Sequence, residues 1–282
     1  MKKKYEFKSI VAETLLIPLY MRAKESRRGK DAILYDKMAE QLVESIDYDY
    51  SKFEGAPLSE VGCVVRGRYF DDAVRRFLKR KKQPIVVNVG CGLDTRYQRI
   101  EDRDKAFFYE LDLPEVIDLR KQLIPEPEND RYLATSLLET AWMDDLRQQH
   151  PDGEFIFTIE GVLMYFYEEE VKAVVRNIAE RFGGGELWFD VCGPMLARSK
   201  HLKPDSLQKH DAQIRSGISD GHLIERWEPR LRLIEQANYM RFYPHRWGLF
   251  GRIMGLFPKL CYRFSSLLGY SILCTNPNSK AK

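Results

Sequence analysis

Two glycines followed closely by an acid stand directly after a run of apolar residues. The apolar run is Pro84-Ile-Val-Val-Asn-Val, and Gly90-Cys-Gly-Leu-Asp-Thr95 follows it. Glycines at such a point let the backbone approach a ligand closely. The third glycine of G-x-G-x-x-G is missing, so the segment fits a pyrophosphate-binding loop poorly. Because glycine pairs are also common in ordinary turns, the pattern needs support from other residues before it indicates a ligand loop.

Carboxylates stand after two further apolar runs. Glu110 and Asp112 lie about 20 residues beyond the glycines, where a carboxylate can accept both hydroxyls of a ribose. Glu160 directly follows the run Phe155-Ile-Phe-Thr-Ile159. A charge at the end of a buried segment needs a partner, and the amino group of an amino-acid-bearing cofactor is one. The alternatives are solvent-facing acids at the second run and a helix-capping acid at Glu160.

Strand and helix patterns alternate through the middle of the chain and would position these residues. Short apolar runs predict five strands, at 84–90, 105–112, 131–135, 155–159 and 186–192. Pro114 fits the first position of a helix. An apolar stripe from Val171 to Phe182 predicts another helix, which Gly183-Gly-Gly185 ends. Strands that alternate with helices indicate a parallel, doubly wound sheet.

Ligands of such sheets bind at the carboxyl ends of the strands. The glycine segment, the acids of the second run and Glu160 all fall at these ends. Ser136 and Leu137, after the third strand, fall there too and are a place where adenine could be held. Residues 1–80 look mainly helical, and residues 194–245 are polar and interrupted by prolines. We expect both regions to form a cap over the carboxyl edge of the sheet.

Composition narrows the class of protein. The chain has 282 residues, 44% hydrophobic and 31% charged, with a net charge of only +3. These values are typical of a globular protein and give no reason to expect a nucleic-acid partner. The five cysteines form no C-x-x-C pair, which favours a reducing compartment and excludes a zinc site of that type. No uncharged run reaches the roughly 20 residues of a membrane span, so we expect a cytoplasmic protein without a membrane partner.

With these residues in place, the chain resembles the leucine carboxyl methyltransferase family, which includes bacterial polyketide carboxyl O-methyltransferases. Four segments carry the resemblance in the family's order, across roughly residues 15–195. They are Arg66-Gly-Arg-Tyr-Phe-Asp71, Val87-Asn-Val-Gly-Cys-Gly-Leu-Asp-Thr95, Phe108-Tyr-Glu-Leu-Asp-Leu-Pro114 and Thr158-Ile-Glu-Gly-Val-Leu-Met-Tyr165. The resemblance implies an O-methyltransferase that uses S-adenosyl-L-methionine.

The resemblance also implies which residues meet the methionine end of the cofactor. Arg66, with Arg68 as a close rival, would bind the methionine carboxylate, since a planar two-pronged donor suits that group. Glu160 would lie near the same end. Lys24 or Arg22 would supply a second positive group from the N-terminal cap.

The residues implied for the nucleoside end of the cofactor lie at the carboxyl ends of the strands. Gly90, Gly92 and Asp94 would border the cofactor, and Asp112 would bind the ribose. The segment Ser136-Leu137 would border the adenine. The family often has aspartate where this chain has Ser136, and a serine accepts a hydrogen bond from the adenine amino group more weakly.

The resemblance implies a Rossmann-like class I methyltransferase fold with a seven-stranded, mostly parallel sheet. We expect a helical cap at 1–80, the cofactor-binding core at 81–193, a cap insertion at 194–245 and completing strands at 246–282. The last two strands should form a hairpin built partly from residues 235–275, ending with Phe264–Cys274.

The acceptor is not identified by any motif. A small-molecule carboxylate is already ionised at neutral pH and needs no base, whereas a hydroxyl is helped by one. His201, His210 and His222 are candidate bases, and Tyr165 and Tyr167 are candidate pocket residues. No catalytic residue is assigned, and no grouping of acids and histidines predicts a metal site.

Three alternative functions remain. A nicotinamide dehydrogenase would have a third glycine where this chain has Asp94-Thr-Arg96. A second alternative is a tRNA- or protein-modifying member of the same family. A tRNA-modifying member would carry a strongly basic face. A non-catalytic nucleotide-binding protein would have lost residues of the cofactor site, whereas Asp112 and Glu160 are present. The oligomeric state is left open.

Overall fold

The computed structural model describes residues 14–199 and 213–274, and one seven-stranded sheet forms their centre. The strands are β1 Pro84–Val89, β2 Phe107–Asp112, β3 Asp130–Ala134, β4 Glu154–Ile159, β5 Glu186–Cys192, β6 Leu231–Ala237 and β7 Ser265–Ile272. Their order across the sheet is β3-β2-β1-β4-β5-β7-β6. The first five strands pair in parallel, and β7 runs antiparallel to both β5 and β6. The predicted seven-stranded, mostly parallel sheet is confirmed.

Helices occupy both faces and one end of the sheet. The α-helices are α2 Leu16–Ser26, α3 Lys37–Ser45, α4 Pro57–Arg80, α5 Arg96–Arg99, α6 Pro114–Leu123, α7 Ala141–Gln149, α8 Glu168–Arg181, α9 Pro194–Ala197, α10 His222–Trp227, α11 Gly248–Met254 and α12 Pro258–Cys261. The 3-10 turns are η1 Gly29–Asp31, η2 Tyr50–Phe53, η3 Arg103–Lys105, η4 Leu163–Tyr165, η6 Tyr239–Arg241 and η7 Pro244–Trp247.

The strands of the parallel part are apolar on both faces because helices cover both. Val87 and Phe157 belong to a core with α7, α8 and α10. Val86 and Ile156, one residue away along the same strands, belong to a second core with α4. This alternation follows from the two-residue period of a strand, and it explains why these strands were recognisable as continuous apolar runs.

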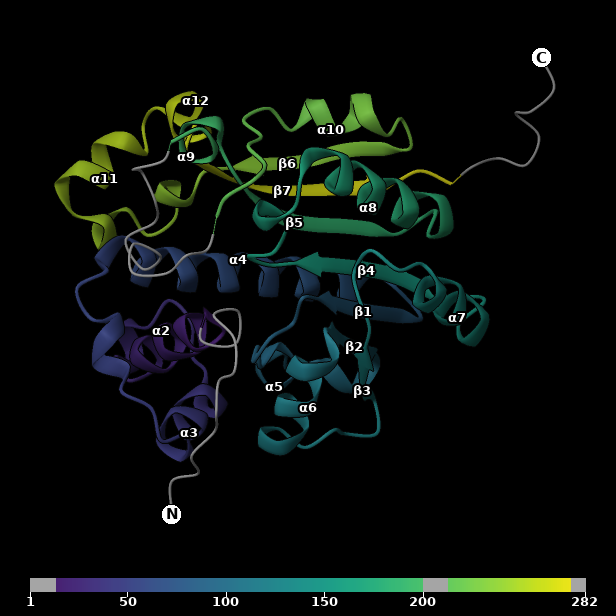
Figure 1. Cartoon of the computed structure of the whole chain (residues 1–282), viewed down its shortest axis with the longest axis horizontal. Coiled ribbons are helices and arrows are strands. Elements are labelled where there is room, and N and C mark those ends of the chain that lie inside the picture. Colours follow the sequence, from purple (N-terminus) through teal and green to yellow (C-terminus); the bar gives the residue numbers. More distant parts are fainter. Residues whose placement is uncertain (1–13, 200–212, 275–282) are drawn as a thin grey trace.

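The remaining helices lie beyond the carboxyl ends of the parallel strands. Figure 1 shows α2, α3, α9, α11 and α12 together at this end, on the left of the view. The chain between β6 and β7 carries η6, η7, α11 and α12, so the last two strands are joined by a helical excursion rather than a short turn. These elements and α2 form a cap against the strand ends.

Several element boundaries differ from the sequence-based ranges. The final strand, predicted at 264–274, is β7, but its partner β6 starts at Leu231 and lies in the range expected for the cap insertion. The helices α11 and α12 occupy part of the range where completing strands are expected. The carboxyl half of α4 packs on the sheet from Tyr69 to Leu78. Within the range expected for the N-terminal cap, α4 thus has a first half that lines the cavity and a second half that packs on the sheet.

Candidate cofactor site

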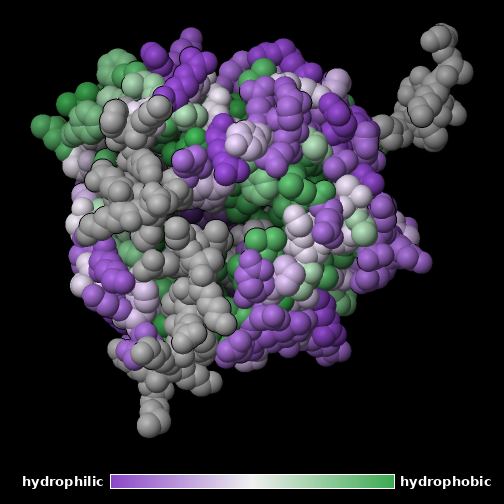
Figure 2. All heavy atoms as spheres, viewed as in Figure 1, coloured by the Kyte–Doolittle hydropathy of each residue, from purple (hydrophilic) through white to green (hydrophobic). Residues whose placement is uncertain are grey.

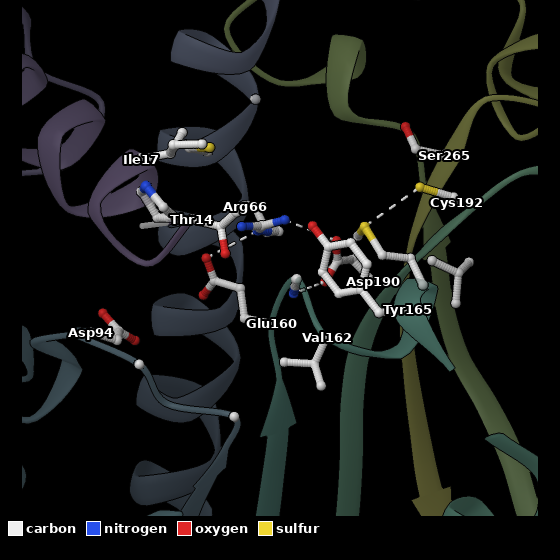
Figure 3. A pocket seen from close by; sticks show the side chains of 18 of the residues that line it. Thr14, Ile17, Arg66, Asp94, Glu160, Val162, Tyr165, Asp190, Cys192 and Ser265 are labelled. Atoms are coloured by element: carbon white, nitrogen blue, oxygen red, sulfur yellow. Dashed lines mark hydrogen bonds and ion pairs between the residues drawn. The ribbon is translucent and has the colours of Figure 1, made fainter. Parts of the chain in front are cut away.

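A cavity of about 1120 Å³ lies between the carboxyl ends of the strands and the cap. Its floor comes from the loops after β1, β2, β3, β4 and β5, and its walls from α2, α4, η6, η7 and α11. Figure 3 shows how side chains from these elements converge from opposite sides. The position agrees with the rule that open α/β sheets bind ligands beside the point where strand order reverses, here between β1 and β4.

The loop after β1 has a conformation that needs its glycines. Gly90 and Gly92 both have positive φ, at 69° and 51°. A Cβ on Gly90 would lie 2.3 Å from a methyl carbon of Val162, and one on Gly92 would lie 3.0 Å from Leu15. The N–H of Gly90 donates to the carbonyl of Leu111 at the end of β2, at 2.7 Å. The loop is thus folded tightly against β2, and its residues line the cavity.

Asp112 at the end of β2 braces this loop and also faces the cavity. One carboxylate oxygen accepts a hydrogen bond from the N–H of Gly92 at 2.7 Å, and the other accepts from the N–H of Leu113 at 2.8 Å. Burial raises the pKa of the Asp112 carboxyl, and these two N–H groups oppose the rise. A carboxylate has about four acceptor positions, so two remain for a ligand.

Glu160 at the end of β4 lies between two arginines. Its Oε1 accepts from Nε of Arg66 on α4 at 3.0 Å, and its Oε2 accepts from Nη2 of Arg96 on α5 at 2.6 Å. The partners of this acid are therefore guanidinium groups of the protein itself, and its expected place near the methionine end of the cofactor stays a prediction.

Asp190 in β5 completes the polar wall. It accepts from the N–H of Gly161 at 2.6 Å, from Nη1 of Arg66 at 3.1 Å and from the hydroxyl of Tyr239 at 3.0 Å. Burial disfavours a charged guanidinium, but Asp190 and Glu160 together hold the pKa of Arg66 well above its usual range. Arg66 is therefore a fixed cation at the wall of the cavity (Figure 3).

Asp94, in the glycine loop, is bound by arginines as well. Its carboxylate lies 2.8 Å from Arg99, 3.2 Å from Arg96 and 3.9 Å from Arg22. Burial alone would raise the pKa of Asp94, but Arg99, Arg96 and Arg22 hold it well below its usual range. The loop is consequently anchored to α2 and α5 by charge.

Most of the residues expected at the cofactor line this one cavity, although they are far apart in the sequence. They are Arg66, Gly90, Gly92, Asp94, Asp112, Ser136, Leu137 and Glu160.

Two of the expected cations lie elsewhere. Arg68 is not among the lining residues and pairs with Asp72 one helical turn along α4, at 2.9 Å. Of the two proposed second cations, Arg22 lines the cavity, whereas Lys24 pairs with Glu54 and Glu60 outside it.

Of the candidate bases and aromatic residues in the described part of the chain, only Tyr165 lines the cavity. His222 is exposed and bonds Glu225, away from the cavity, while His201 and His210 lie outside the described residues. Tyr165 lines the cavity, with its hydroxyl on the Arg66 side (Figure 3). Tyr167 is exposed and does not line it.

The lining residues that were not recognised from the sequence include Arg96, Asp190 and Tyr239, which make the polar contacts described above. An acid inside the apolar strand Glu186–Cys192 was a usable signal for Asp190, of the same kind that identified Glu160. Arg96 directly follows the glycine segment, but an arginine at a helix start is ordinarily solvent-exposed. Tyr239 had no distinguishing sequence context.

Comparison with known proteins identifies the ligand class. A family model described as leucine carboxyl methyltransferase matches residues 16–179. The tetracenomycin polyketide synthesis O-methyltransferase TcmP of Streptomyces glaucescens is 30% identical over 226 residues, which cover 80% of this chain and 82% of TcmP. A Mycolicibacterium gilvum protein assigned as an S-adenosyl-L-methionine-dependent methyltransferase is 32% identical over 171 residues, 54% of this chain and 57% of that protein.

Solved structures share the fold. A protein of Thermobifida fusca YX assigned as a methyltransferase superposes with a TM-score of 0.55 at 14% identity, covering 90% of this chain and 94% of that one. The plantazolicin methyltransferase BpumL, solved with a triazolic desmethylPZN analogue and S-adenosylhomocysteine, gives a TM-score of 0.51 at 10% identity, covering 93% of this chain and 99% of that one.

The residues present fit S-adenosylmethionine. The glycine loop lines the cavity in a conformation that has no room for a Cβ at Gly90. Asp112 has acceptor positions that its two backbone contacts leave for a diol, and Arg66 offers a fixed cation for a carboxylate. No group of three or more potential metal ligands is found within residues 14–199 and 213–274. The chain belongs to the leucine carboxyl methyltransferase family and is an S-adenosyl-L-methionine-dependent methyltransferase.

Proposed function

We propose that this methyltransferase acts on an oxygen of a small apolar molecule, and that the oxygen belongs to a carboxylate. One observation carries the proposal: the cavity extends well beyond the glycine loop into a part lined by apolar and sulfur-containing side chains. These include Cys63, Met164, Tyr165, Cys192, Met240, Trp247, Phe250, Met254 and Phe264. At about 1120 Å³ the cavity exceeds the volume of about 300–1,000 Å³ typical for one ligand, so it has room for the cofactor and an acceptor.

The roles follow from the contacts described above. Asp112 would hold the ribose hydroxyls, and the segment Ser136-Leu137 would border the adenine. Arg66, kept in place by Glu160 and Asp190, would bind the methionine carboxylate. When bound, the cofactor supplies a methyl group already activated by its sulfonium. The protein then needs mainly to align the acceptor with that methyl group and to exclude water.

The polar groups of the cavity favour an acceptor that arrives ionised. Among the described residues no histidine lines the cavity, and Asp94, Glu160 and Asp190 are each bound to arginine. Burial raises the pKa of Tyr165 to about 12, so its hydroxyl stays protonated and can donate a hydrogen bond but cannot serve as a base. A carboxylate needs no base, and it can accept that hydrogen bond.

The test uses cofactor with a radiolabelled methyl group and two matched acceptors, a polycyclic aromatic carboxylic acid and the corresponding polycyclic phenol. We expect label to be transferred to the acid and released as methanol by mild alkali, because a methyl ester hydrolyses and a methyl ether does not. We also expect turnover to vary little with pH between about 6 and 9, since no group would need to lose a proton.

Other outcomes would contradict the proposal. Alkali-stable label on the phenol alone would assign the enzyme to hydroxyl acceptors. Transfer only to tRNA, or only to a peptide ending in leucine, would assign it to macromolecular acceptors. Binding of S-adenosylhomocysteine without transfer to any of these acceptors would favour the non-catalytic alternative.

A further inference from the structure

Six large apolar side chains project into solvent from α11, α12 and the turn between them. We call them the apolar ridge: Leu249, Phe250, Ile253, Leu256, Phe257 and Leu260, exposed by 74%, 65%, 50%, 75%, 56% and 39%. Fourteen large apolar side chains of the described residues are exposed in all, so almost half of them fall within twelve consecutive positions. Figure 2 shows hydrophobic atoms protruding at the upper left, where Figure 1 places α11.

The helices of the ridge place small residues inward and large ones outward. A Cβ on Gly251 would lie 2.2 Å from Cβ of Trp247, and one on Gly255 would lie 2.8 Å from the carbonyl oxygen of Met240. These glycines allow close packing against η6 and η7, and the larger apolar residues are left outside. A surface helix ordinarily has the opposite arrangement, and exposed apolar patches of this kind mark interaction sites.

The charge around the ridge has one sign. From Gln236 to Lys282 the chain contains no Asp or Glu, while it contains seven Lys or Arg residues. Arg252, Lys259 and Arg263 are exposed, and none has a carboxylate partner within residues 14–199 and 213–274. Arg246, nearer the core, pairs with Glu25. The ridge is therefore a set of apolar side chains flanked by cations that have no carboxylate partner in the described part of the chain.

We propose that the apolar ridge docks on an anionic membrane surface. Apolar side chains of this length can enter the boundary between headgroups and acyl chains, and the flanking cations are attracted to anionic lipid. No helix of the described residues is long and apolar enough to cross a membrane, so the contact lies on the bilayer. This proposal departs from the sequence-based expectation of no membrane partner, because exposure of the ridge is visible only in the fold.

A second copy of the chain is a poorer occupant. A two-fold contact through the ridge would bring Arg252 and Lys259 of both copies to one interface, and the same stretch of chain has no acid to pair with them. The membrane proposal does not depend on which acceptor is methylated. Phe250 and Met254 of α11 also line the cavity, so a membrane bound at the ridge would lie beside the cavity wall.

The test is co-sedimentation of the full chain with vesicles. We expect binding to vesicles of equal parts phosphatidylcholine and phosphatidylglycerol, and little binding to phosphatidylcholine alone. The double variant Leu256→Ser, Phe257→Ser should bind at least about tenfold more weakly, because two apolar side chains no longer enter the bilayer. Tyr35→Ser with Ile234→Ser, which removes two exposed apolar side chains elsewhere, should bind as the wild type does.

Charge is tested with a second matched pair. Arg252→Glu with Lys259→Glu should weaken vesicle binding by roughly 30-fold or more, at about a tenfold loss per 1.4 kcal/mol. Lys121→Glu with Arg131→Glu makes the same change in net charge on α6 and β3, far from the ridge (Figure 1), and should have a much smaller effect. None of the four residues lines the cavity, so binding of S-adenosylhomocysteine should be unchanged in both variants and shows that they are folded.

Three results would overturn the proposal. The first is no difference between wild type and the ridge variant on anionic vesicles. The second is equal weakening by both charge-reversal variants, which would show that net charge alone drives binding. The third is a wild-type dimer in sedimentation velocity that Leu256→Ser with Phe257→Ser makes monomeric, without vesicle binding by either protein, which would assign the ridge to self-association.

Discussion

Replacing Asp112 by alanine tests whether the carboxylate at the end of β2 holds a ribose. In the structure two of its acceptor positions are used by the N–H groups of Gly92 and Leu113, and the remaining positions face the cavity. The variant Asp112→Ala would therefore remove two separate things. One is the pair of hydrogen bonds available to a ribose diol, and the other is the brace that holds Gly92.

The expected loss follows from the first of these. A hydrogen bond to a charged group contributes about 1.5–3 kcal/mol, and two bonds to one diol share a single carboxylate. We therefore expect a loss of about 2–3 kcal/mol, or roughly 30- to 150-fold in affinity. Adenosine and S-adenosylhomocysteine should lose the same factor, because both carry the diol.

Calorimetric titration with dideoxyadenosine separates the two effects of the substitution. This ligand has the adenine but lacks the 2′ and 3′ hydroxyls, so any loss of its affinity in Asp112→Ala reports the lost brace alone, and we expect that loss to be much smaller than the loss for adenosine. If dideoxyadenosine is weakened as strongly as adenosine, the carboxylate acts through the position of Gly92 and the assignment to the ribose is wrong.

Three further predictions concern cofactor binding and stability. Arg66→Ala should weaken the binding of S-adenosylhomocysteine by roughly 10- to 150-fold and leave the binding of adenosine unchanged in the same titration. Arg68→Ala is the control: its arginine pairs outside the cavity, so neither affinity should change. Equal weakening of the binding of both ligands by Arg66→Ala would contradict the role of Arg66. Dialysis against a chelator should leave the affinity for S-adenosylhomocysteine within about twofold, as methyl transfer to an oxygen anion needs no metal, and a loss restored by magnesium would show otherwise. Burial raises the pKa of Asp130 from 3.8 to about 8, so between these pH values the folded state binds a proton more tightly than the unfolded chain and loses stability as pH rises. Asp130→Asn should remove this dependence, with a gain of at least about 1 kcal/mol above pH 8 and almost none near pH 4 in urea denaturation, and a gain independent of pH would refute the explanation.

The parallel part of the sheet could be predicted because each strand carries its own signal. β1 and β4 are buried on both faces, so they consist mainly of apolar residues, and a glycine or an acid directly follows them. β6 is an edge strand whose buried and exposed residues are mixed, as in Leu231-Arg-Leu-Ile-Glu-Gln-Ala237. Its pairing depends on β7, more than thirty residues later, and no local pattern shows such a partner.

The candidate site likewise contains residues that the sequence could locate and residues that it could not. Gly90, Asp112 and Glu160 follow directly from strand ends, and the rule for ligand sites in open sheets is enough to locate them. Arg68 could not be separated from Arg66 by residue type. The structure distinguishes them because positions two apart on a helix point about 200° apart, which sends one side chain to Glu160 and the other to Asp72.

The 24-residue helix α4 has a consequence for how this enzyme could change its specificity. Its first half carries Cys63 and Arg66 into the cavity wall, and its second half packs on the sheet as far as Leu78. Because a helix turns about 100° per residue, one residue inserted between Arg66 and Phe70 would rotate the arginine away from Glu160. A chimera that takes its cap from a relative must therefore exchange α4 whole, with a junction near Lys81, or keep its register residue for residue. An insertion in a loop of the cap would leave the direction of Arg66 unchanged, whereas an insertion in this helix would not.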